Sequence, residues 1–122
     1  IRNPLYETPG KAYANAGACH LKLGDLVTAE GLLQNSLNLM PDDANAKLQM
    51  AIIHYRRGEF DNAAQALQEF ANNDPNAEVL WLLVRVHRKL GNRLAEARYG
   101  TQLRRKFPLS PESQELLKGN FE

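Results

Sequence analysis

A pattern of histidine and glycine recurs along this 122-residue chain at a nearly constant interval. A histidine stands four positions before a glycine three times, and the second interval between copies is one position shorter than the first. A proline follows each of these glycines at the same distance. Self-similarity at a fixed period is the signature of repeat architectures, so the chain is predicted to contain three copies of one structural unit. The histidines are His20, His54 and His87, the glycines Gly24, Gly58 and Gly91, and the prolines Pro41, Pro75 and Pro108.

Each unit has the pattern of a helix pair, because glycine after a periodic stretch ends a helix and proline marks the break before the next unit. Thr8 is the expected N-cap of the first helix, with Pro9 at its first position. A seventh, shorter helix beginning near Ser110 would cover the core of the last unit. No segment shows the alternation expected of a strand. The predicted helices span about 9–23, 26–39, 43–57, 60–73, 76–90, 93–106 and 110–118.

The third unit is one position shorter than the second between its proline and its glycine. The difference appears when the segment from Pro75 to Gly91 is compared with the segment from Pro41 to Gly58. We therefore expect the helix at 76–90 to be rotated by about 100° relative to its equivalents.

A helix–turn–helix period of about 34 residues is the tetratricopeptide length. The first two units resemble the tetratricopeptide pattern at Tyr13, Ala16, Gly17, His20, Ala29, Leu37, Ala51, Phe60, Ala63 and Leu67, besides the repeated glycines and prolines. The predicted fold is therefore all-α, a right-handed tetratricopeptide superhelix with three helix pairs and a C-terminal capping helix. We expect a single array over residues 1–122, with repeats at about 9–41, 43–75 and 76–108 and the cap at about 110–118.

Catalytic and metal chemistry find no support in the residue pattern. Equivalent histidines on stacked repeats lie at least one helix-packing distance apart, about 8–10 Å, whereas zinc ligands all lie about 2 Å from one ion. We expect the histidines to fill half-buried sites between repeats and Cys19 to be a small buried thiol. No paired carboxylates, glycine-rich phosphate loop or Cys/His metal spacing occurs elsewhere. We therefore predict no catalytic residue, no cofactor, no metal and no enzyme activity.

Composition argues against a membrane span, and the chain has the features of an excised or mature piece. Hydrophobic residues make up 43% and charged residues 24%. No stretch approaches the roughly 18 consecutive apolar residues that a span requires. The chain opens at Ile1 without an initiator methionine or a signal peptide, so we expect it to come from something longer.

The net charge of +1 conceals a separation of charge along the chain. Residues 25–80 contain nine acidic and three basic side chains, and residues 81–108 contain one acidic and eight basic ones. The basic third is either a solvated face or a contact for an acidic peptide, lipid headgroups or nucleic acid.

The helix at 76–90 combines a wide apolar arc with a polar side on which Trp81 falls. Trp81 is either covered by Arg85 in an internal cation–π contact or exposed as a binding hot spot. Both interpretations remain open at this point.

The first helix of each pair lines the concave groove in tetratricopeptide arrays. The equivalent positions here form an apolar trough that runs into a basic end, which suits an amphipathic helix or an extended peptide with an acidic end. Chaperone-adaptor tetratricopeptide domains bind a C-terminal carboxylate with lysine and asparagine side chains. Ala14 and Ala18 occupy places where those side chains would be needed, which disfavours a chaperone adaptor. The predicted groove residues are Leu21, Leu48, Ile52, Tyr55, Trp81, Arg85, Arg88 and Lys89.

Three segments resemble one branch of this superfamily. They are Asn3-Pro4-Leu5-Tyr6 with Thr8-Pro9 and Asn15 to Cys19, then Trp81 to Arg85, and then Tyr99-Gly100 with Gln102 to Arg105 and Phe107-Pro108. Together they resemble the type IV pilus biogenesis proteins called PilF or PilW, the pilotins of the pilus secretin. The resemblance covers nearly the whole chain and corresponds to the C-terminal half of such proteins.

The resemblance implies a periplasmic tetratricopeptide lipoprotein at the outer membrane of a Gram-negative bacterium. Family members help the secretin subunit reach that membrane and multimerise, and they act by protein binding without catalysis. The implied partner is the secretin subunit or another pilus component, with a lipid anchor outside this chain; Cys19, inside a predicted helix, is not the lipidation site. Two alternatives remain. One is a general adaptor for an acidic or apolar peptide. The other is a nucleic-acid binder that uses the basic third, but the acidic middle of the chain counts against nucleic-acid binding.

Overall fold

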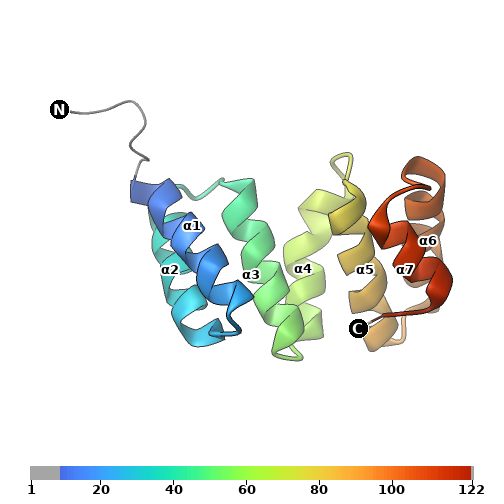
Figure 1. Ribbon diagram of the computed structural model, residues 1–122, viewed down its shortest axis with the longest axis horizontal. Coiled ribbons are helices and arrows are strands. Elements are labelled where there is room, and N and C mark those ends of the chain that lie inside the picture. The colour runs from blue at the N-terminus through green and yellow to red at the C-terminus, as the bar shows by residue number, and fades with distance from the viewer. Residues whose placement is uncertain (1–8, 122) are drawn as a thin grey trace.

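The computed structural model describes residues 9–121. Within that range the chain forms helices only, and Figure 1 shows them following one another along the long axis of the molecule. The expected all-α solenoid of helix pairs is confirmed, and every helix begins and ends within two residues of its predicted bounds. The helices are α1 (Pro9–Lys22), α2 (Leu26–Leu39), α3 (Ala44–Arg56), α4 (Phe60–Ala71), α5 (Ala77–Leu90), α6 (Arg93–Lys106) and α7 (Pro111–Lys118).

The helix before each repeated glycine closes with the same backbone hydrogen bonds. In the third copy, the N–H of Gly91 donates to the Arg88 carbonyl and the N–H of Asn92 donates to the His87 carbonyl. Gly91 has a φ of 75°, in the left-handed region where a side chain is strained. The bonds Asp25 to His20 and Glu59 to His54 repeat this closure, at 2.9 and 2.8 Å. The histidine–glycine spacing is therefore the spacing of a helix stop.

Polar side chains cap the starts of most helices. The Asp43 carboxylate accepts from the Ala46 N–H at 2.9 Å at the start of α3, and the Asn76 side chain accepts from the Val79 N–H at 2.9 Å at the start of α5. Such caps satisfy amide groups that have no partner within the helix. The predicted Thr8 cap and the first segment of the pilotin resemblance at 3–6 lie outside the described residues.

The predicted rotation of α5 is wrong. The N-cap and the closing glycine are equally far apart in α3, from Asp43 to Gly58, and in α5, from Asn76 to Gly91. The third unit is therefore one residue shorter in the loop before α5, where the shortening removes no helical hydrogen bond. Residues at equal distances from the two glycines consequently occupy equivalent positions on the two helices.

Close packing of α1 on α2 depends on small residues. A Cβ on Gly17 would lie 2.7 Å from Leu33 Cγ, and the Ser36 hydroxyl donates to the Gly10 carbonyl at 2.8 Å. The prediction of a buried Cys19 is wrong, because Cys19 is exposed. It follows Gly17 by two positions and therefore lies about 200° further around the helix, away from α2.

The buried residues form two apolar clusters that meet at α3. The N-terminal cluster joins α1, α2 and α3, and the larger cluster joins α3 to α6. Ile52 packs against both clusters. Because α4, α6 and α7 all contact α5, the middle of this helix is largely buried, whereas Glu78 near its start and Arg88 to Leu90 at its end are exposed. Among the described residues no helix is both long and apolar enough to cross a membrane.

Candidate protein-binding site

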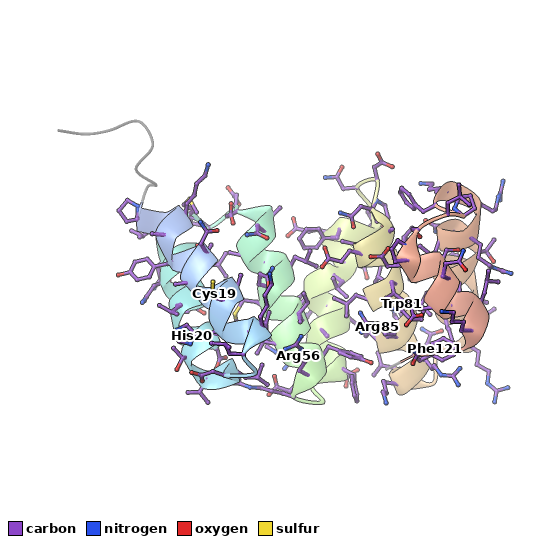
Figure 2. The ribbon with its side chains drawn as sticks, in the orientation of Figure 1. Cys19, His20, Arg56, Trp81, Arg85 and Phe121 are labelled. Atoms are coloured by element: carbon purple, nitrogen blue, oxygen red, sulfur yellow. The ribbon has the colours of Figure 1, made fainter. Side chains whose placement is uncertain are left out.

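Three aromatic rings and two guanidinium groups from α3, α5 and the segment after α7 lie against one another in a single stack. Arg85 Cζ lies 5.2 Å from the centroid of the Tyr55 ring and 5.4 Å from the centroid of the Trp81 ring. The Phe121 ring stacks on Trp81, with centroids 5.6 Å apart and planes 29° apart, and Arg88 Cζ lies 4.0 Å from the Phe121 centroid. We call Tyr55, Arg85, Trp81, Phe121 and Arg88 the cation–aromatic stack; Figure 2 shows Arg85, Trp81 and Phe121 on one side of the molecule.

Arg85 is the half-buried cation at the centre of this stack. Burial lowers the pKa of Arg85 from its usual value, and Tyr55 opposes that shift. The guanidinium remains charged, because arginine keeps its proton in proteins. Its Nε–H group is buried and finds no hydrogen-bond acceptor among the described residues. The stack therefore contains a charged N–H group whose hydrogen bonding is incomplete.

A basic hollow of about 540 Å³ lies beside the stack, between the ends of the first two repeats and α5. Tyr55 and Phe60 contribute two rings in edge contact, with centroids 5.6 Å apart. Arg56 and Lys89 contribute two cations, and Arg56 also donates to the Leu21 carbonyl at 2.8 Å. Rings and cations together can bind aromatic side chains and carboxylates. The remaining lining residues are Gly24, Leu26 and Gly58.

The predicted groove residues differ widely in exposure. Leu21, Leu48 and Trp81 are buried, with exposed fractions of 4%, 9% and 7%. Ile52, Tyr55 and Arg85 are half-buried, and Arg88 and Lys89 are exposed. The structure brings Tyr55, Trp81, Arg85 and Arg88 together in the stack, and it leaves Leu21 in the separate N-terminal cluster. That these residues line a binding groove remains a prediction.

Trp81 has the internal contact that was one of its two predicted environments. Arg85 lies over one region of the indole and Phe121 stacks on it, so the side chain belongs to the larger apolar cluster. Neither Phe121 nor Phe60 was among the predicted groove residues, although Phe60 was identified as a repeat-pattern position. The available signal for Phe121 was Gly119, which has a φ of 73° and turns the chain back at the end of α7.

The three histidines are half-buried, as expected, but the contacts described for them lie within their own helix pairs and not between repeats. His54 Nδ1 lies 2.7 Å from Glu59 Oε1, and His20 Nδ1 lies 3.3 Å from Asp25 Oδ2 without hydrogen-bond geometry. His87 instead stacks on Tyr99, with ring centroids 5.6 Å apart. Burial, and then the charge of Arg98, lower the pKa of His87. These contacts brace the ends of the helix pairs.

Comparison with known proteins agrees with this architecture. The family model described as tetratricopeptide repeat matches residues 20–86. The type IV pilus assembly protein PilF of Pseudomonas aeruginosa is 30% identical over 116 residues, which cover 94% of this chain and 46% of that protein.

Two solved structures are similar over nearly the whole chain. The crystal structure of PilW, a widely conserved type IV pilus biogenesis factor, is 31% identical with a TM-score of 0.79, and the match covers 94% of this chain and 53% of PilW. A structure of Pseudomonas aeruginosa PilF is 29% identical with a TM-score of 0.79, covering 98% of this chain and 54% of the other. The chain thus spans about half the length of these relatives.

Proposed function

The chain belongs to the tetratricopeptide repeat family, and from this premise we propose that it holds a protein partner of the type IV pilus machinery without catalysis. It would do so as a single array of three repeats, at 9–41, 43–75 and 76–108, with the cap at 110–118. The groove would be lined by the first helix of each repeat, with the predicted residues Leu21, Leu48, Ile52, Tyr55, Trp81, Arg85, Arg88 and Lys89 around it.

One observation carries this proposal: the structures of PilW, a type IV pilus biogenesis factor, and of PilF, a type IV pilus assembly protein, match nearly all of this chain at a TM-score of 0.79. An identity of about 30% accompanies that match, so the likeness includes sequence as well as fold. The basic hollow and the cation–aromatic stack supply the chemistry, since their cations and rings suit a partner segment that is acidic and aromatic.

We propose further that the role is that of a pilotin, which helps the pilus secretin reach the outer membrane and multimerise. The protein would then act at the periplasmic face of that membrane, and a lipid anchor outside this chain would supply the membrane affinity. Under this proposal, the part described here contributes contacts with a protein, either the secretin subunit or another pilus component.

Deleting the gene in the source organism tests the pilotin role. We expect fewer secretin multimers in outer-membrane fractions and fewer pili, and we expect the intact gene to restore both. Lys89→Glu should restore them less well, because it reverses a charge in the basic hollow. Arg105→Glu is the matched control, since it makes the same charge change at an exposed position of α6 outside the hollow. Normal secretin multimers and normal piliation in the deletion strain would contradict the proposal.

A further inference from the structure

The Trp81 ring is covered in part by a residue that lies far along the chain, beyond α7. Trp81 is 7% exposed although it stands on the side of α5 opposite the apolar arc. Phe121 stacks on the indole, and Arg88 lies over the Phe121 ring in turn. Arg88 also donates to Glu96 Oε2 at 3.1 Å, which holds its guanidinium in place from α6. Phe121 therefore lies in a slot between the Trp81 indole and the Arg88 guanidinium.

The chain delivers Phe121 to this slot through a turn held by few hydrogen bonds. After α7 the Gly119 N–H donates to the Leu116 carbonyl at 3.1 Å, and the Asn120 N–H donates to the Glu115 carbonyl at 3.0 Å. The Asn120 side chain also donates to Glu115 Oε1 at 2.8 Å. Figure 1 shows the chain returning from α7 toward α5. Phe121 itself is half-buried, and the contacts that the structure gives it are ring contacts.

The surroundings of the slot are basic. Arg85 lies on the indole beside Phe121, Arg88 lies over the phenyl ring, and exposed Lys89 follows Arg88 along α5. Two acidic side chains act on these arginines: Glu96 pairs with Arg88, and the charge of Glu78 acts on Arg85. Potentials across an interface tend to be complementary, so an incoming aromatic residue suits this slot best when acidic residues flank it. In the sequence Phe121 is itself followed by an acidic residue, Glu122.

We propose that the slot formed by Trp81, Arg85 and Arg88 is an aromatic-anchor site for a protein partner, and that Phe121 is its built-in occupant. The partner contributes a segment in which one aromatic side chain is flanked by aspartates or glutamates. That side chain replaces Phe121 between the indole and the Arg88 guanidinium, and the flanking carboxylates meet Arg85, Arg88 and Lys89. The inference rests on the proposed protein-binding function and names the chemistry of its partner segment.

Competition by Phe121 has a measurable consequence. A site that is available for only a fraction of the time binds its ligand more weakly by that same fraction. If Phe121 occupies the slot about nine-tenths of the time, its removal strengthens binding about tenfold. Trp81 is the single tryptophan of the chain, so its fluorescence reports on the slot directly.

The test uses the full protein, its Phe121→Ala variant and a peptide in which one phenylalanine stands between two pairs of glutamates. We expect Phe121→Ala to shift Trp81 emission to longer wavelength with unchanged helical circular dichroism, and to bind the peptide about tenfold more tightly than the parent protein. The same peptide with alanine in place of phenylalanine should bind neither protein. Leu109→Ala is the matched protein control, because it also removes an apolar side chain, 90% exposed and outside the slot, and should leave affinity unchanged.

Equal peptide affinity for the parent protein and Phe121→Ala overturns the inference, as does equal affinity for the two peptides. If Phe121→Ala loses helical circular dichroism, Phe121→Leu replaces it in the test. The leucine still covers the indole but offers no ring to Arg88, so this variant must also bind the peptide more tightly than the parent protein does. The gene-deletion experiment distinguishes failure of the proposed function from failure of this inference. Secretin multimers that form normally without the gene would contradict the pilus role, whereas peptide binding to the purified protein tests only the slot.

Discussion

Two glycines within helices show how differently one residue type serves this chain. Gly17 faces α2, and a Cβ there would lie 2.7 Å from Leu33 Cγ, an atom of a fully buried side chain. Gly31 lies in α2, where an added Cβ would meet no atom within 4 Å. Gly17 is therefore required by close packing, whereas Gly31 only adds backbone entropy to the unfolded chain.

The two glycines predict opposite effects of the same substitution. Gly17→Ala should lower the free energy of unfolding by about 1–3 kcal/mol, because the fully buried Leu33 side chain would have to shift to make room for the added methyl group. Gly31→Ala, its matched control, should raise that free energy by about 0.5–1 kcal/mol. Urea denaturation followed by circular dichroism measures both. A Gly17→Ala protein as stable as the parent would contradict the close approach of α1 and α2.

Trp81 illustrates why the slot is better probed at Phe121. Trp81 belongs to the larger apolar cluster, so its replacement by alanine combines any loss of binding with loss of packing. Truncation of a buried aromatic residue costs about 3–5 kcal/mol in typical proteins. Phe121 is half-buried and packs against that cluster, so its removal probes the slot while Trp81 itself stays in place.

At the scale of the element, the three helix stops are alike in backbone and different in side chains. The carbonyls of His20, His54 and His87 accept the same closing hydrogen bond. In the first two copies an acidic side chain follows the glycine and approaches the imidazole, whereas Asn92 follows the third glycine. His87 instead lies against Tyr99 near the charge of Arg98, and its pKa is lowered. The third stop therefore contains a histidine whose protonation is disfavoured in the folded protein.

His87 predicts acid destabilisation with a defined sign. Because its folded pKa lies below the ordinary value of 6.5, the unfolded chain takes up the proton more readily than the folded protein. The contribution of His87 to stability is thus full above that pH and declines as the pH falls through the ordinary value toward the folded pKa. His87→Phe keeps a ring on Tyr99 and removes the proton site. Between about pH 7.5 and pH 5, the melting temperature should fall less in His87→Phe than in the parent protein.

The comparison of the two pH profiles isolates His87, since the other titrating groups are shared by both proteins. Parallel melting profiles would contradict the prediction, because they would mean that burial and the charge of Arg98 do not make protonation of His87 destabilising.

At the scale of the whole molecule, the two apolar clusters and the separation of charge divide the solenoid into unequal parts. The larger cluster surrounds α5, and the N-terminal cluster reaches only as far as α3. Polar contacts cross between repeats: the Arg57 Nη1 group donates to Glu30 Oε1 at 2.8 Å, and the Arg56 Nη1 group donates to the Leu21 carbonyl at 2.8 Å. Stability in such arrays is approximately the sum of the repeats and their neighbouring interfaces.

This inequality predicts a gradient in hydrogen exchange. Amides of α5 should exchange most slowly, because this helix is buried against α4, α6 and α7, and amides of α1 and α2 should exchange faster through local opening. Mass spectrometry of peptic fragments measures the gradient under native conditions. Uniform protection from α1 to α6 would show a single cooperative unit instead.

Local signals in the sequence were sufficient for the helices and their ends. A glycine in the left-handed region, a capping aspartate or asparagine and a proline in the loop act within a few residues of themselves, so Gly91 and Asn76 are informative without knowledge of the fold. For the same reason the family could be anticipated from the period alone. Four members of the stack were also named in advance, because their distance from the closing glycine places them on equivalent helix positions.

Only the tertiary structure decided which of those side chains are accessible and what lies against them. Cys19 is exposed and Trp81 is buried because neighbouring elements, α2 in one case and Phe121 in the other, determine which side of a helix is covered. The missing residue of the third repeat left α5 in register because the loop before it could shorten. Helix periodicity determines the angle of a side chain about its own axis, whereas burial depends on contacts between residues far apart in the chain, such as Trp81 and Phe121.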